Sequence, residues 1–191
     1  MTETSGGMIG AVKDGIVSAI RGVGEITDAV IDTVSASMIN AIQKTGAVGG
    51  ALTGAISDTA RGVIQGASEV GGDLGSAAKG TVIGVLQGTK EVGGEAIKTI
   101  TTTAGAIVKS TSEVGGDLGV AAKGAVEGAI TGAKDVGVSA EEAASAAATG
   151  ALKAAGEIGT TAAAQVRDAV TGTIAGVKVV LKEPFRSEEE K

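Results

Sequence analysis

The sequence predicts an all-α protein made of long amphipathic, glycine-rich helices with a 22-residue repeat. Apolar residues recur at helical spacing, and the period-two alternation of a half-buried strand is absent. The single proline, Pro184, lies near the C-terminus, so no earlier position loses its backbone donor. Together these observations favour helix over nearly the whole chain.

The repeat is clearest in the tetrapeptide EVGG, which begins at Glu69, Glu91 and Glu113. Weaker versions (EITD, AVGG, DVGV and EIGT) continue the spacing of 22 residues in both directions. Residues 3–178 therefore divide into eight copies without an insertion or deletion. Twenty-two residues make six turns of about 3.67 residues, so each position returns to nearly the same bearing around a helix.

The apolar columns of the repeat predict one apolar face along the helix. We assign to this face Ile20, Ile42, Ile64, Val70, Leu86, Val92, Val114, Ile130, Leu152 and Ile174. Because these residues keep their phase through the copies, we expect them to pack against other helices or against a lipid surface.

Glycines at a spacing of four predict a second feature, a smooth ridge along one flank of the helix. A glycine inside a helix costs about 1 kcal/mol relative to alanine, so 33 glycines need compensation. A ridge of small residues supplies it by letting another backbone approach closely. The predicted packing ridge consists of Gly62, Gly66, Gly80, Gly84, Gly88, Gly124, Gly128, Gly132, Gly172 and Gly176. The alternative interpretation is a drift of composition toward small residues.

Charged residues also recur in register, at two different angles. The acidic edge consists of Glu25, Glu69, Glu91, Glu113, Asp135 and Glu157. The basic edge consists of Lys13, Lys79, Lys90, Lys123, Lys134, Arg167 and Lys178. One hypothesis is that parallel helices lie side by side, basic edge against acidic edge; the other is that both edges are merely solvated.

Two arrangements fit these patterns. In the favoured one, the chain is one nearly continuous helix, because the apolar face keeps its phase through the glycines. In the other, the glycine pairs at 71–72, 93–94 and 115–116 are turns, and Asp73, Glu95 or Asp117 begins the next helix. That alternative is an up-and-down array of about eight short helices. In both, residues 1–7 are a flexible N-terminus, 8–180 the helical repeat region and 181–191 a polar tail.

Composition excludes several functional classes. Without histidine or cysteine the chain lacks disulfides, imidazole and thiolate metal ligands and a serine–histidine triad, so we predict no catalytic, cofactor-binding or metal-binding residue. The net charge of −6 argues against binding nucleic acid. No uncharged stretch is long enough for a transmembrane helix. Aromatic residues are nearly absent and large aliphatic ones are scarce, so we expect the chain to need a partner surface.

The segments TGAKDVG and QGTKEVG follow an 11-residue register rich in glycine, threonine, valine and lysine. Over about residues 8–180 this register resembles the amphipathic repeat helices of synucleins, perilipins, exchangeable apolipoproteins and late-embryogenesis-abundant proteins. The resemblance implies folding on a lipid or droplet surface, or stress protection. Those lipid binders usually carry bases on both flanks of the apolar face; here one flank is acidic, which favours helix-to-helix assembly.

These features predict a non-enzymatic structural protein whose helices self-associate laterally into a bundle, layer or filament. Expected partners are further copies of the chain and a membrane or lipid-droplet surface, with a cytoplasmic or peripheral membrane location. Neither a cofactor nor a small-molecule substrate is expected. The alternative is a largely disordered stress protectant that becomes helical on lipid binding or drying.

Overall fold

A computed structural model describes residues 3–22, 25–46, 50–90 and 96–181. The described chain is helical apart from one short hairpin. Its helices are α1 (Glu3–Gly22), α2 (Ile26–Thr45), α3 (Gly50–Glu69), α4 (Leu74–Thr89), α5 (Ala96–Glu113), α6 (Leu118–Gly132), α7 (Ala140–Ile158) and α8 (Thr160–Val170). A 3-10 turn, η2 (Ala133–Val136), follows α6, and strands β1 (Gly172–Ile174) and β2 (Val177–Val179) follow α8. The all-α prediction is confirmed, and the arrangement is the array of about eight short helices.

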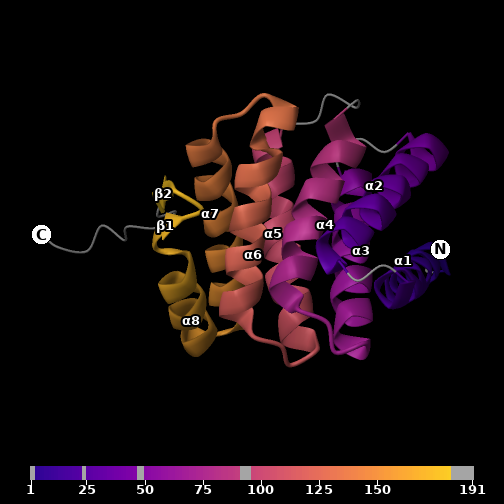
Figure 1. Cartoon of the computed structure of the whole chain (residues 1–191), viewed down its shortest axis with the longest axis horizontal. Helices are drawn as coiled ribbons and strands as arrows, with labels where there is room; N and C mark the ends of the chain where they lie inside the picture. The colour runs from indigo at the N-terminus through magenta and orange to yellow at the C-terminus, as the bar shows by residue number, and fades with distance from the viewer. Residues whose placement is uncertain (1–2, 23–24, 47–49, 91–95, 182–191) are drawn as a thin grey trace, which may run out of the picture.

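The helices form two layers. In one layer α1, α3, α5 and α7 pack in succession, and in the other α2, α4, α6 and α8 do the same. Successive helices of the chain connect the layers, so that the array advances from its N-terminal end at α1 and α2 to its C-terminal end at α8 and the hairpin (Figure 1). Each helix therefore has its closest neighbour two helices away in the sequence.

The favoured single long helix does not form because glycine turns end the helices at the period of the repeat. Gly71 and Gly115 take left-handed φ angles of 67° and 68°. The amide of the next glycine then donates to the carbonyl five residues earlier, in Gly72→Ala67 and Gly116→Thr111. This hydrogen-bond pattern closes a helix and reverses the chain. Gly137, with φ 72°, ends η2 in the same way.

A capping residue begins the next helix two positions after each of these left-handed glycines. The Asp73 carboxylate accepts a hydrogen bond from the Ser76 amide at 2.6 Å, and Asp117 accepts one from Val120 at 3.0 Å. Ser139 forms a reciprocal capping box with Glu142. The apolar face keeps its phase because each repeat of 22 residues is one helix plus one turn. The turn predicted at 93–94, with Glu95 after it, lies outside the described residues.

The interior changes in character along the array. Near the N-terminal end it is filled by larger aliphatic side chains such as Ile16, Val34 and Met38, all fully buried. Through α6 and α7 it consists mostly of alanine. Three buried threonines, Thr81, Thr89 and Thr103, donate their hydroxyl groups to the carbonyl four residues earlier in their own helix. The chain's own second layer therefore supplies the partner surface that the composition requires.

The boundaries of the helical region differ from those expected. Helix α1 begins at Glu3, inside the segment expected to be a flexible N-terminus. The helices end at Val170, and residues 172–179 form an antiparallel hairpin instead. This segment is rich in the β-branched residues Thr, Ile and Val, which favour strands. The predicted polar tail lies outside the described residues from position 182 onward.

Candidate functional site

The glycine ridges lie at contacts between parallel helices two apart in the sequence. A Cβ atom on Gly62 of α3 would lie 2.9 Å from the Ile9 carbonyl oxygen of α1, and one on Gly66 equally close to that of Lys13. Moving one turn along α3, from Gly62 to Gly66, also moves the contact one turn forward along α1, from Ile9 to Lys13. The two helices therefore run parallel. Any side chain larger than hydrogen at these positions would force the helices apart.

The second layer repeats this packing. Gly80, Gly84 and Gly88 of α4 lie along α2, where a Cβ on Gly84 would come within 2.8 Å of the Val34 Cβ. Gly124, Gly128 and Gly132 of α6 lie along α4 in the same manner. Eight of the ten glycines assigned to the packing ridge therefore sit where one backbone meets another helix.

Gly150 is a further close contact that the sequence analysis missed. It lies on α7 against the backbone of Thr101 in α5. The Thr101 hydroxyl also donates across this contact to the Ala146 carbonyl at 3.3 Å. Gly150 has no glycine at spacing four on either side, so only its place in the 22-residue register could have identified it.

Gly172 and Gly176 were assigned to the ridge, and this part of the prediction is wrong. They lie in the hairpin with φ angles of 102° and 82°, which glycine adopts readily. Two other assigned residues, Ile174 and Lys178, are on the strands as well. The β-branched sequence of residues 172–179 folds as a hairpin instead of continuing α8.

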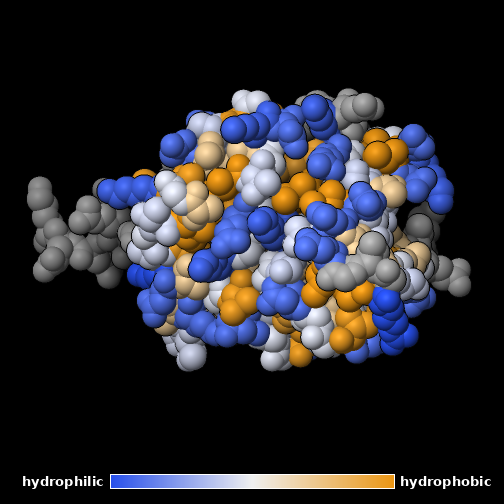
Figure 2. Space-filling model, in the orientation of Figure 1, coloured by the Kyte–Doolittle hydropathy of each residue, from blue (hydrophilic) through white to orange (hydrophobic). Residues whose placement is uncertain are grey.

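The apolar face is turned inward, between the two layers. Ile64, Leu86 and Ile174 are buried. The others that the structure describes are half-buried: Ile20, Ile42, Val70, Val114, Ile130 and Leu152. Val92 lies outside the described residues. The exposed surface is a mixture of hydrophilic and smaller hydrophobic areas on the side seen in Figure 2, and it carries few large apolar side chains, with Ile39 at 43% exposure among them.

Among the described residues, three ion pairs join neighbouring helices in the layer of α1, α3, α5 and α7. Lys13 of α1 reaches Glu69 of α3 at 3.0 Å. Arg61 of α3 makes two hydrogen bonds, of 2.8 and 2.9 Å, to the Glu113 carboxylate of α5. Lys109 of α5 reaches Glu157 of α7 at 2.6 Å. We call this series the ion-pair ladder.

The ladder pairs a base on each helix with an acid near the C-terminus of the next helix in its layer. Hydrogen bonding to Glu69 raises the pKa of Lys13, and hydrogen bonding to Lys109 lowers the pKa of Glu157. Because these side chains are between 33% and 53% exposed, water screens each pair and it stabilises the fold only slightly. The ladder therefore sets which edges face each other and in what register, more than it adds stability.

Other members of the two charged edges lie at the surface. Glu25 precedes α2, and Asp135 lies in η2, both exposed. Of the remaining bases, Lys79 is half-buried. The others are exposed: Lys90, Lys123, Lys134, Arg167 and Lys178. Glu91 lies outside the described residues. Arg61 and Lys109 were missed because each is displaced by one helical turn from the strict repeat, on the same side of its helix.

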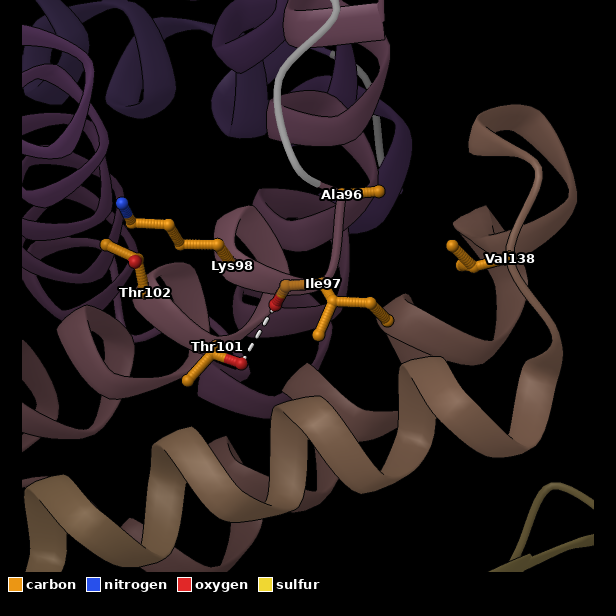
Figure 3. A pocket seen from close by; sticks show the side chains of 6 residues that line it. All are labelled: Ala96, Ile97, Lys98, Thr101, Thr102 and Val138. Atoms are coloured by element: carbon orange, nitrogen blue, oxygen red, sulfur yellow. Dashed lines mark hydrogen bonds between the residues drawn. The ribbon is translucent and has the colours of Figure 1, made fainter. Parts of the chain in front are cut away.

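A surface hollow of about 620 Å³ lies where α5 begins. Ala96, Ile97 and Val138 line it together with Lys98, Thr101 and Thr102. Figure 3 shows the Lys98 side chain pointing away from Val138, and the Thr101 hydroxyl already donating to the Ile97 carbonyl at 2.8 Å. A substrate site requires polar groups that converge on one point, and the polar groups of this hollow do not.

No group of three or more acidic residues in the described part of the chain is arranged to hold a metal ion. Nor does any described helix combine the length and the apolar character needed to cross a bilayer. No model of a known protein family matches the sequence, and no curated protein is similar to it. The structural observations alone therefore carry the functional argument.

Proposed function

We propose that the chain is a non-enzymatic structural protein: a two-layer helical array that associates with further copies of itself. One observation carries this proposal: the glycine ridges, the apolar columns and the charged edges of the sequence all lie at contacts between helices. Glycine ridges set the helix spacing, apolar columns fill the space between layers, and charged edges set the register. A repeat array built from nearest-neighbour contacts can be extended by any unit with the same edges.

The burial of the apolar columns also favours self-association rather than binding to a lipid surface. A lipid-binding amphipathic helix needs a continuous apolar face directed outward. Here the columns that would form it are buried between layers or half-buried. Lipid binding would require the array to open, whereas association with another array would not.

Circular dichroism combined with sedimentation tests the proposal, in plain buffer and with phosphatidylcholine/phosphatidylserine vesicles. Strong helicity without vesicles, together with particles that grow with protein concentration, is the expected result. Helix formation only with vesicles would favour a lipid coat, and a coil that folds only on drying would favour a stress protectant. A compact helical monomer at every concentration would overturn the self-association part of the proposal.

A further inference from the structure

The ion-pair ladder leaves one acid without a base at the N-terminal end of the array. Its acids recur every 44 residues, at Glu25, Glu69, Glu113 and Glu157. The last three each meet a base from the preceding helix of their layer. Glu25 is exposed, and in the described chain no helix precedes α1 to supply its base.

A matching base is left at the C-terminal end. Lys153 of α7 lies 44 residues after Lys109, which is the last base of the ladder. It is exposed, and among the described residues it makes no ion pair; its charge helps to lower the pKa of the neighbouring Glu157. It therefore occupies the position from which Lys109 reaches the next helix; Arg61 and Lys13 lie one and two helical turns before that position in their own helices.

The edge of α7 around Lys153 is open. Leu152 is half-buried, although Val108, its counterpart 44 residues earlier, is fully buried. A Cβ atom on Gly156 would meet no other atom within 4 Å. Strand β2 also packs on α7. In the C-terminal half of α7, Ala151, Ala154 and Ala155 are buried, whereas Lys153, Gly156 and Glu157 form an exposed face.

The other layer has complementary charge at its two ends. The outer edge of α2 carries Asp28 and Asp32, both exposed, while exposed Arg167 and Lys178 lie near the opposite end of the array. Asn40 and Lys44 of α2 stand at the register positions of Gly84 and Gly88 in α4. Because these side chains prevent the close backbone approach seen inside the array, a contact at this end depends on charge more than on packing.

We propose that copies of this chain join head to tail, with Lys153 of one copy pairing with Glu25 of the next and so continuing the ion-pair ladder between molecules. This inference rests on the proposed self-association and adds its geometry. The contact is heterologous, so it generates an open filament or a ring. Its dependence on exposed charge makes it weak and sensitive to salt.

Charge reversal tests the junction by sedimentation velocity at about 20 mM and about 500 mM salt. Glu25→Lys and Lys153→Glu each place like charges at the junction, so each variant alone should assemble at least about tenfold more weakly than the original chain at low salt. An equimolar mixture of the two should regain assembly, because every junction between unlike variants again joins opposite charges. Asp135→Lys and Lys123→Glu, exposed sites away from the two ends, are the matched controls and should assemble normally.

Circular dichroism confirms that each variant keeps its helices. Assembly of the original chain that is unchanged by either reversal, or a mixture that fails to recover, overturns the head-to-tail junction and leaves the proposed self-association standing. An original chain that stays monomeric at low salt overturns both.

Discussion

Replacing Gly128 with alanine tests the role of the glycine ridges most sharply, because two opposite effects of known size compete there. In an isolated helix the change stabilises by about 1 kcal/mol. In the array a Cβ atom on Gly128 would lie 2.5 Å from the Lys79 carbonyl oxygen and 3.1 Å from the Lys79 Cα. These are backbone atoms of α4 and cannot rotate away.

Ordinary van der Waals contact begins near 3.4 Å, so α4 and α6 must separate by about 0.9 Å. Overpacking of this kind costs about 1–3 kcal/mol or more, and here it disturbs the whole contact between two helices. With the cost at about 3 kcal/mol, because backbone atoms clash, and the helix gain of about 1 kcal/mol subtracted, the net loss is about 2 kcal/mol. This loss lowers the thermal midpoint by about 4–8 °C in a chain of this length.

Gly54→Ala is the matched control. Gly54 lies inside α3, and a Cβ atom there would meet nothing within 4 Å. This variant should gain up to about 1 kcal/mol, and its thermal midpoint should rise by about 2–4 °C. Thermal unfolding followed by circular dichroism measures both. If Gly128→Ala stabilised the protein as much as Gly54→Ala, the ridge would not be a packing surface.

Three further predictions concern the caps, the core and the ion pairs. Asp117→Ala removes the hydrogen bond to the Val120 amide and should cost about 1 kcal/mol in denaturant unfolding, whereas Asp117→Asn should retain most of it. Thr111→Val should stabilise by about 1 kcal/mol, because the buried Thr111 hydroxyl has no partner in the described structure; a loss would show that the hydroxyl is satisfied. The stability from the Lys109–Glu157 pair is fully present above the ordinary glutamate pKa of about 4.3 and fades as the pH falls through the lowered pKa of Glu157. In Glu157→Gln the thermal midpoint should therefore fall less steeply as the pH is lowered below about 4.3. The same steepness as in the original chain would show that the Lys109–Glu157 pair does not stabilise the fold.

The period of the sequence predicts helix and the residues that face inward, but it does not distinguish a rod from an array. In one long helix, 22 residues complete six turns, so each repeat places its apolar residues on the same side. In the array, each repeat is one helix and one turn, so each helix again places the same residues inward. The decisive signal is local: a glycine that can be left-handed, followed two residues later by a capping aspartate, as at Gly71 and Asp73. The constant phase of the apolar face is compatible with both arrangements and so does not favour the rod.

The charged edges predict that parallel helices can pair, yet the partners depend on the fold. Lys13 meets Glu69, 56 residues away, because α3 lies beside α1. A strict repeat cannot find Arg61 and Lys109, which are shifted by one turn. The hairpin after α8 was not predicted because the 22-residue columns continue through it; of its two strands, only β2 has the more exposed central residue and more buried flanking residues of an alternating strand.

Zero-length cross-linking with a carbodiimide tests the two-layer array most directly. It joins a lysine to a carboxylate only when the two are in contact, as Lys13 and Glu69 are at 3.0 Å and Lys109 and Glu157 are at 2.6 Å. In one continuous helix Lys13 and Glu69 would lie about 84 Å apart. Mass spectrometry of dilute, isotopically mixed protein should find both cross-links within single molecules. Cross-links confined to neighbours four residues apart, or found only between molecules, would contradict the fold and everything inferred from it.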